Sequence, residues 1–430
     1  MADSTVMDLL RFATIGSVDD GKSTLIGRLL VDTRQLFDDQ LEAVAHASVS
    51  RGVGDLDLSF VTDGLRAERE QGITIDVAYR YAATPTRKFI IADCPGHVQY
   101  TRNMATGAST ADLALAVVDA TAGLKEQTRR HLCIAALLGV RRVIVAANKM
   151  DLAEWAKDPY DAIAAEVDAL ADRLGIEEPL VVPISALHGD YVVEPTGAAP
   201  WYDGPTVLGA LEAAPAGGWA GEGTVGSRLP IQWVLRHPTG KRTYAGMVDG
   251  APLAPDQRMV LLPAGIDATV RRVATADGDL ALAPVGRCVD VDLHEDTPAG
   301  RGDMLASPPL PQVLDHLTAT VCWFGEEQAR EQPREPLTAG QRFRVKHTTR
   351  TTVGFVEHVH ARLDVNRLVL EPADTLEAND IGIVSITTAD PLVVDPYTAN
   401  RITGSFVLVD ERTNATLAGA MVGEPTFATA

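Results

Sequence analysis

A glycine, a lysine and a serine near the N-terminus have the spacing of a loop that binds phosphate. Gly16 is followed, after four residues, by Gly21, Lys22 and Ser23, which fits the pattern G-x-x-x-x-G-K-[ST]. Glycines permit backbone angles at which successive N–H groups point inward at phosphate oxygens. The lysine can supply a positive charge for the phosphates, and the serine hydroxyl can bind Mg²⁺. The alternative is an ordinary turn that happens to be rich in glycine.

The segments on either side of this loop favour the phosphate-binding interpretation. An apolar run at 12–15 precedes the loop and has the composition of a strand. After the loop, Leu25, Ile26, Leu29 and Leu30 recur at helical spacing. A helix in this place directs the positive end of its dipole at a bound anion. The predicted order of strand, glycine loop and helix therefore suits a phosphate loop.

Three further motifs, each at the end of its own apolar run, indicate the nucleotide. The aspartate of DCPG (93–96) can reach Mg²⁺, and its glycine N–H can contact the γ-phosphate. NKMD (148–151) ends in a carboxylate that can accept hydrogen bonds from N1–H and the amine of guanine, whereas adenine offers neither group in that arrangement. SAL (185–187) can present a backbone N–H to guanine O6. Ligands bind at the carboxyl ends of strands in doubly wound sheets, so the four motifs together predict a GTP site.

The predicted GTP-binding residues are those of the four motifs and their immediate neighbours. They are Gly16, Ser17, Val18, Asp19, Asp20, Gly21, Lys22, Ser23, Thr24, Asp93, Cys94, Pro95, Gly96, His97, Asn148, Lys149, Met150, Asp151, Ser185, Ala186 and Leu187.

Composition narrows the class of protein. Charged residues make up 22% of the 430 residues and hydrophobic residues 46%, as in ordinary globular proteins. The N-terminus lacks the basic and apolar segments of a signal peptide, and no apolar run approaches the length of a membrane span. The four cysteines are far apart, which argues against a disulfide framework and against a zinc site. We expect a cytoplasmic protein.

The net charge of −20 bears on the partners of this chain. A strongly acidic surface does not attract polyanions non-specifically, although a local basic patch could still bind one. We therefore expect neither nucleic acid nor a membrane as a partner.

The hydrophobic pattern divides the chain into three parts. Up to about residue 213, apolar strand-like runs alternate with helical segments, which predicts an α/β domain with a mostly parallel sheet covered by helices on both faces. Residues 214–227 are rich in glycine and alanine and are predicted to form a linker. Short β-rich runs then recur in two blocks, 228–312 and 313–430, as in β-barrels or sandwiches. We expect a P-loop domain (1–213) followed by two β-barrel domains.

Longer segments resemble a known superfamily. Residues 64–81 and 93–109 are similar to translation-factor GTPases of the elongation factor Tu type. Within that superfamily, "QGITIDVAYRY", "QYTRNMATGAS", "RTTV" and "NRITGSFVLVDERTNATLAGAM" resemble the large GTPase subunit of bacterial sulfate adenylyltransferase. The resemblance covers about residues 10–425.

This resemblance implies a function. The chain would bind and hydrolyse GTP and couple that hydrolysis to the reaction ATP + sulfate → adenylyl sulfate + pyrophosphate. Adenylyl transfer itself would take place on a separate, smaller catalytic subunit, with which the chain would form a heterodimer or a larger assembly. The alternative is a translation factor that delivers an aminoacyl-tRNA. Ser17, Asp20 and Gln71 depart from the usual residues of translation factors and suit the sulfate-activating branch.

The resemblance also implies roles for single residues. His97 would position the attacking water, and Asp19 corresponds to an acidic loop residue implicated in catalysis. Thr74 would close over Mg²⁺ and the γ-phosphate. Val18 and Ile73 would form the hydrophobic pair beside the histidine.

The ligands expected for Mg²⁺ are the oxygen-bearing side chains of three motifs: Ser23, Thr74 and Asp93.

Overall fold

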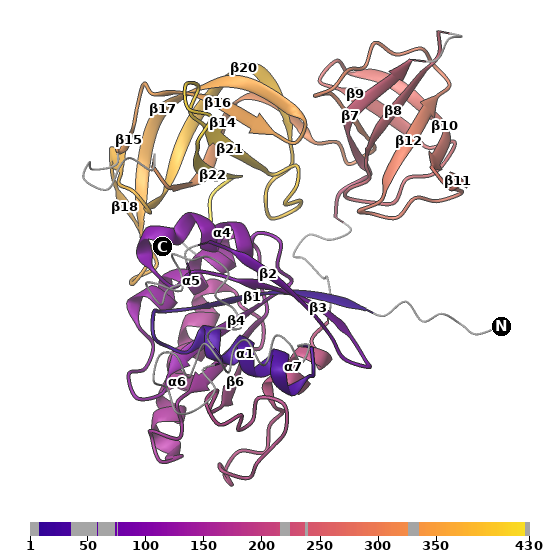
Figure 1. Cartoon of the computed structure of the whole chain (residues 1–430). Coiled ribbons are helices and arrows are strands. Elements are labelled where there is room, and N and C mark those ends of the chain that lie inside the picture. The colour runs from indigo at the N-terminus through magenta and orange to yellow at the C-terminus, as the bar shows by residue number, and fades with distance from the viewer. Residues whose placement is uncertain are drawn as a thin grey trace, which may run out of the picture. The chain divides into compact units, whose positions relative to one another are not determined.

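The structure is a computed structural model that describes residues 8–35, 58, 74, 76–215, 224–236, 240–325 and 335–425. The chain forms two compact units (Figure 1). The first contains residues 1–219 together with 365–368, and the second contains the rest.

The first unit is built on a six-stranded sheet with the strand order β2-β3-β1-β4-β5-β6. All neighbouring strands pair in parallel except β2, which pairs antiparallel with β3. The strands are β1 (Leu9–Gly16), β2 (Ala78–Ala83), β3 (Lys88–Asp93), β4 (Leu113–Asp119), β5 (Val143–Asn148) and β6 (Leu180–Pro183). The helices are α1 (Lys22–Asp32), η2 (Val98–Tyr100), α4 (Thr101–Ala108), α5 (Glu126–Leu137), α6 (Lys157–Leu174) and α7 (Val207–Ala213).

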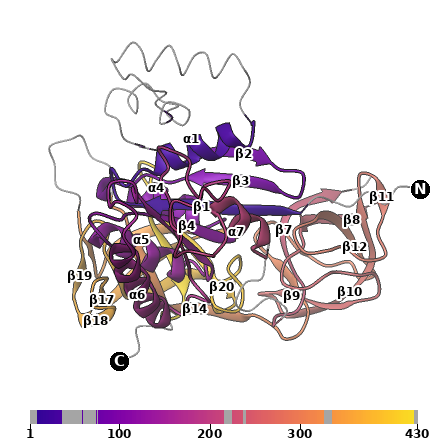
Figure 2. The ribbon, with the colours of Figure 1, turned by 90° about the horizontal axis from the view of Figure 1, so that it is seen from below.

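Helices cover both faces of this sheet, as the sequence predicts. α1 and α7 lie on one face, and α4 and α5 lie on the other (Figure 1). Viewed from below, α1 runs along the sheet next to β2 and β3 (Figure 2). Every residue of β4 and β5 is buried, because a central parallel strand is covered on both faces. β2 is an edge strand that the apolar runs did not indicate; its side chains are half-exposed, and Tyr81 is 73% exposed.

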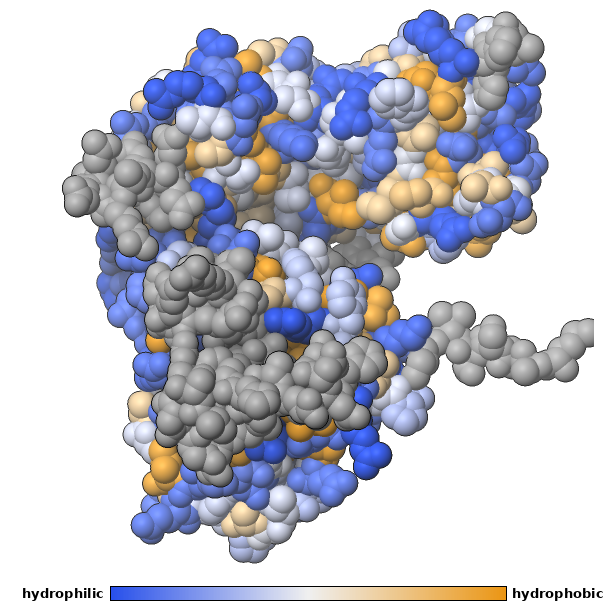
Figure 3. Space-filling model, in the orientation of Figure 1, coloured by the Kyte–Doolittle hydropathy of each residue, from blue (hydrophilic) through white to orange (hydrophobic). Residues whose placement is uncertain are grey.

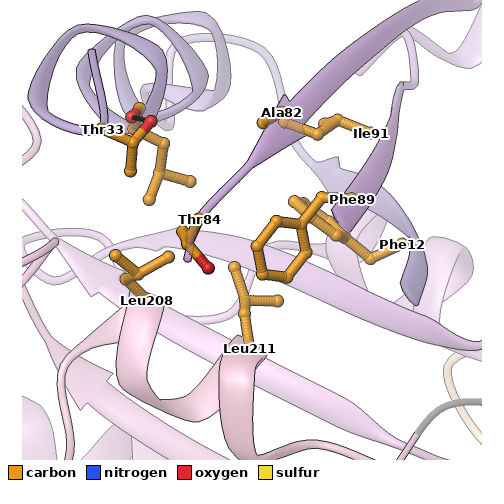
Figure 4. A pocket seen from close by; sticks show the side chains of 9 residues that line it. Phe12, Thr33, Ala82, Thr84, Phe89, Ile91, Leu208 and Leu211 are labelled. Carbon is orange, nitrogen blue, oxygen red and sulfur yellow. Dashed lines mark hydrogen bonds between the residues drawn. The ribbon is translucent and has the colours of Figure 1, made fainter. Parts of the chain in front are cut away.

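A small apolar cavity of about 20 Å³, partly open to solvent, lies between α1, β2, β3 and α7 (Figure 4). The second half of α1 contributes to its wall, whereas the phosphate loop precedes the first turn of that helix. Its lining consists of Phe12, Leu29, Thr33, Ala82, Thr84, Phe89, Ile91, Leu208 and Leu211. The lining holds two hydroxyl groups and no charge, so this cavity belongs to the hydrophobic packing and not to the nucleotide site.

The second unit contains two closed β-barrels, which confirms the barrel prediction. In the first barrel, β9 and β10 pair to close the ring, and in the second, β16 and β17 do so. The strands of the first are β7 (Arg228–Arg236), β8 (Arg242–Met247), β9 (Arg258–Leu262), β10 (Ile266–Thr275), β12 (Cys288–Leu293) and β13 (Met304–Ala306), with β11 (Gly278–Asp279) added at one side. The strands of the second are β14 (Gln312–Trp323), β16 (Arg342–His347), β17 (Arg350–Asp364), β20 (Ile381–Val394), β21 (Ser405–Val409) and β22 (Thr416–Val422), with β18 (Val369–Pro372) added. β15 (Leu337–Thr338) and β19 (Thr375–Leu376) form a separate small ladder.

The domain limits proposed from the sequence stay a prediction. The limit at 312/313 falls one residue inside β14, which begins at Gln312. Within the linker predicted at 214–227, residues 216–223 lie outside the described residues.

The space-filling view shows one face of the molecule (Figure 3). The face seen in Figure 3 carries mainly hydrophilic residues, with hydrophobic ones between them in small groups. In the described ranges, no helix combines the length and the apolar character needed to span a membrane.

A buried ion pair joins the two barrels of the second unit. The Arg228 guanidinium at the start of β7 donates from Nε and Nη2 to the two carboxylate oxygens of Asp395, over 3.0 and 2.9 Å. The arginine side chain is 0% exposed and the aspartate side chain 5%. The guanidinium also donates to the carbonyl oxygens of Ser307 and Pro309. A buried charge of this kind is tolerated only while it is paired and hydrogen-bonded.

Arg228→Met should destabilise the second unit. It leaves the Asp395 carboxylate buried without its cation, which costs about 3 kcal/mol of unfolding free energy. The double variant Arg228→Met/Asp395→Asn removes both charges and should recover part of that loss. Denaturant unfolding of the three proteins checks this, and equal losses in the single and double variants would contradict the role of the ion pair.

Candidate nucleotide-binding site

The phosphate loop connects β1 directly to α1. β1 ends at Gly16, and α1 begins at Lys22 after Gly21, whose φ of 94° is the left-handed conformation that favours glycine. A Cβ atom on Gly21 would also lie 2.3 Å from the Asn148 amide nitrogen. No side chain caps the N-terminus of α1, so the N–H groups of its first turn remain available to an anion.

The Lys22 ammonium lies inside this loop. Its Nζ donates to the carbonyl oxygens of Gly16 and Ser17, over 3.2 and 2.8 Å. Burial lowers the pKa of Lys22, because it removes water from the ammonium, while the negative charges of Asp93 and Asp20 oppose that shift. The structure thus holds a largely dehydrated positive charge where phosphate oxygens would bind.

One aspartate and one asparagine tie the motifs together. The buried Asp20 accepts the Ser17 N–H through its carboxylate, at 3.0 Å. Its backbone carbonyl accepts a hydrogen bond from Asn148 Nδ2 at 2.8 Å, and Asn148 Oδ1 accepts the Ala186 N–H at 2.9 Å. The phosphate loop, NKMD and SAL are therefore connected through a single asparagine side chain.

The other residues of NKMD are held by contacts with neighbouring strands and loops. Met150 is buried, and its N–H donates to the Ile184 carbonyl at the end of β6. Lys149 donates to Asp119 at the end of β4 over 2.7 Å. The Asp151 carboxylate is 20% exposed and lies 3.8 Å from the His188 imidazole. The carboxylate predicted to bind guanine is thus accessible on a loop whose neighbours are anchored.

DCPG packs against the phosphate loop. A Cβ atom on Gly96 would lie 2.4 Å from Lys22 Nζ and 2.9 Å from the Gly16 carbonyl oxygen, so only glycine fits here. Asp93 is 1% exposed and accepts a hydrogen bond from the Thr14 hydroxyl. Burial raises the pKa of the Cys94 thiol, so this cysteine is a packing residue and not a nucleophile.

His97 and Thr74 have fewer described contacts with the phosphate loop than DCPG has. The Nδ1 atom of His97 accepts the Gln99 N–H at 3.3 Å, and the His97 side chain is partly exposed. Thr74 is half-buried, and within the described residues no hydrogen bond joins it to the loop. Asp19 is exposed with a φ of 65°, and Ile73 lies outside the described residues.

The structure brings four predicted motifs to one edge of the sheet. Ser23 and Thr24 lie in the first turn of α1, Pro95 and Ser185 are buried beside their motif partners, and Val18 is half-buried in the loop. Leu187 is 56% exposed.

Helix α5 contributes contacts that the sequence analysis missed. Two side chains of this helix and the residue just before it, Lys125, hold the phosphate loop. Lys125 Nζ lies 2.6 Å from Asp20 Oδ1, the Thr128 and Ser17 hydroxyls are 3.0 Å apart, and His131 Nδ1 accepts the Gly16 N–H at 3.3 Å. The i, i+3, i+6 spacing in "KEQTRRH" is visible in the sequence, but nothing there indicates which face meets the loop.

His131 can fill this position only as a neutral imidazole. Burial lowers the pKa of His131 to about 3, and the nearby Lys22 charge adds to that shift. A protonated Nδ1 could not accept the Gly16 N–H, so the native state resists protonation.

His131 should therefore make stability depend on pH. The pKa of His131 is about 3 in the folded protein and 6.5 for an ordinary histidine, the value we take for the unfolded chain. Between pH 3 and 6.5, unfolding therefore takes up a proton. The unfolding free energy falls as pH falls from 6.5 towards 3. His131→Gln, whose amide oxygen can accept the same N–H without titrating, should remove up to about 1.4 kcal/mol per pH unit of that slope. Denaturant unfolding at several pH values checks this. The exposed His358→Gln is the control, and an unchanged slope in His131→Gln would contradict the assignment.

Comparisons with known proteins agree with this geometry. Residues 7–223 match the family described as "Elongation factor Tu GTP binding domain", and residues 316–423 match "GTP-eEF1A C-terminal domain-like". The chain is 46% identical to "Sulfate adenylyltransferase subunit 1" of Laribacter hongkongensis, over 98% of this chain and 86% of that protein. It is 46% identical to the protein of the same name from Aeromonas salmonicida, over 97% and 87%. It is 47% identical to "Bifunctional enzyme CysN/CysC" of Mycobacterium tuberculosis, over 96% of this chain and 67% of that protein.

The matched GTP-binding domain supports a guanine nucleotide as the ligand, and the residues of this chain that would bind it stay a prediction. The chain belongs to the family of sulfate adenylyltransferase subunit 1 proteins, with a GTP-binding domain of the elongation factor Tu type.

Proposed function

We propose that this chain binds and hydrolyses GTP and couples that hydrolysis to the reaction ATP + sulfate → adenylyl sulfate + pyrophosphate. The observation that carries the nucleotide assignment is the link from Asn148 to both the phosphate loop and SAL. The identity to relatives named sulfate adenylyltransferase subunit 1 supports the coupled reaction over delivery of an aminoacyl-tRNA.

The coupling has a thermodynamic reason. Adenylyl sulfate contains a phosphosulfate anhydride, so its formation from ATP and sulfate is strongly uphill. A GTPase whose conformational states bind a partner with different affinities can supply the missing free energy. We place adenylyl transfer on a separate, smaller catalytic subunit, which the word "subunit" in the relatives' names supports. We further propose that the complex works in the cytoplasm, where both nucleotides are available.

Mg²⁺ fits the residues at the phosphate end of the site. Ser23, Thr74 and Asp93 would offer two hydroxyls and a carboxylate, the hard oxygen ligands that this ion prefers. The Asp93 carboxylate is buried close enough to Lys22 to act on its pKa. When bound, Mg²⁺ neutralises charge on the phosphate oxygens. Lys22 and the first-turn N–H groups of α1 hold the same oxygens from the protein side.

We propose that His97 orients the attacking water rather than acting as its base. Because Nδ1 accepts the Gln99 N–H, the proton of a neutral ring is on Nε2. The nitrogen left to face a water molecule is then a donor, which can position the water but cannot take its proton. Phosphoryl transfer to water depends mainly on such positioning and on charge stabilisation.

Asp151→Asn should change the nucleotide that binds. Xanthine carries a carbonyl where guanine carries its amine, and an amide can donate to that carbonyl. We expect weaker GDP binding, by about tenfold or more, and a gain in binding of xanthosine diphosphate. Competition against a fluorescent GDP analogue measures both. Unchanged GDP affinity in this variant would remove NKMD from the site.

His97→Ala should keep GTP affinity, since the side chain contacts water and not the nucleotide. It should lose partner-stimulated GTP turnover on the order of a hundredfold. The assay measures the rate at which GDP is formed from GTP by a complex reconstituted with the small subunit. A separate titration measures GTP binding. Full stimulated turnover in this variant would exclude the water-positioning role.

A further inference from the structure

Arg28 on α1 contacts the loop predicted to face guanine. Its Nε donates to the Ala186 carbonyl oxygen at 3.3 Å, and its Nη2 donates to the Leu187 carbonyl oxygen. α1 begins at Lys22, so one helix carries the phosphate-binding lysine in its first turn and this arginine in its second. Both ends of the proposed nucleotide site are thereby tied to the same rigid element.

The surroundings hold Arg28 in this orientation. Its guanidinium lies 3.6 Å from the Asp32 carboxylate, one turn further along α1, and its side chain is 23% exposed. On the loop side, a Cβ atom on Gly189 would lie 3.4 Å from both Arg28 Cδ and Asp32 Oδ2, so the loop packs closely on this pair. The Gly189 N–H donates to the Ser185 carbonyl at 2.7 Å and closes the turn.

The contact fixes the direction of a backbone N–H. The Ala186 carbonyl and the Leu187 N–H belong to one planar trans peptide group and point in opposite directions. Arg28 holds the carbonyl towards α1, so the Leu187 N–H points away from that helix. The Ala186 N–H already donates to Asn148, whereas the Leu187 N–H has no hydrogen-bond partner among the described residues.

We propose that Arg28 is a specificity-determining positioning residue, which holds the Leu187 N–H in place to donate to O6 of guanine. Adenine carries an amine at that position, which would oppose the N–H. This inference rests on the proposed GTP site and deepens it. Asp151 and the Leu187 N–H then recognise different atoms of the base: the carboxylate binds N1–H and the exocyclic amine, and the N–H that Arg28 orients binds O6.

The test compares three diphosphates. GDP and IDP share O6, IDP lacks the exocyclic amine, and ADP lacks O6. Arg28→Met should weaken GDP and IDP each by about tenfold, as expected for one lost hydrogen bond, and should leave ADP nearly unchanged. The GDP-to-ADP preference therefore falls about tenfold, while the GDP-to-IDP preference stays at the wild-type value. Competition against a fluorescent GDP analogue gives all three affinities.

A matched control lies just beyond the C-terminal end of the same helix. Arg34 is exposed just beyond α1, and Arg34→Met makes the same chemical change without a contact to the loop in the described residues. It should leave all three affinities at wild-type values. Arg28→Lys, which keeps the charge and a donor, should recover part of the GDP-to-ADP preference.

The outcomes are distinct. If Arg28→Met weakens GDP, IDP and ADP by one common factor, Arg28 only supports the fold of the pocket and the inference fails. Unchanged GDP-to-ADP preference also overturns it. If the wild-type chain itself shows no preference for GDP over ADP, the proposed function fails first, independently of Arg28.

Discussion

The hydrogen bond from Asn148 to the backbone carbonyl of Asp20 is the contact on which the rest of the site depends. It joins the phosphate end to the base end, and it lies inside the protein, where a lost partner would leave a buried polar group unsatisfied at a cost of about 1–3 kcal/mol. The same asparagine accepts the Ala186 N–H. Phosphate recognition and guanine recognition cannot shift independently while both bonds are made.

Electrostatics explains why the loop is held by neutral as well as charged groups. Lys22 brings one positive charge into the interior, and Asp93 and Asp20 balance it. The group that accepts the Gly16 N–H needs a free lone pair, so it must be a base that stays neutral, as the buried His131 does. Lys125, the residue just before α5, is the only further charge that this segment brings to the loop in the described contacts, and it pairs with Asp20.

The sequence predicted those parts of the molecule whose signals are local. The phosphate loop lies between a buried strand and a helix within 9–32, and the motifs at 93–96 and 148–151 each begin at the end of a buried strand. A local pattern is enough to find all three. Strand patterns alone could not separate barrels from sandwiches, because closure depends on long-range pairings such as β16 with β17 around the ring.

Sequence patterns could not predict contacts between residues that are far apart in the chain. The ion pair of Arg228 and Asp395 links residues 167 positions apart, and Arg28 looks like an ordinary surface residue of an amphipathic helix. The face of α5 that holds the loop was missed for the same reason. β2 was missed because an edge strand with half-exposed side chains lacks the continuous apolar run of a buried strand.

In the proposed function, nucleotide turnover at this site drives adenylylation. The most direct measurement is adenylyl sulfate accumulation by the complex of this chain with its small subunit, supplied with ATP, sulfate and either GTP or xanthosine triphosphate. In the wild-type complex we expect accumulation with GTP only. In the Asp151→Asn complex we expect accumulation with xanthosine triphosphate and little with GTP. Equal accumulation with both nucleotides in both complexes, or accumulation without either, would show that turnover at this site does not drive adenylylation.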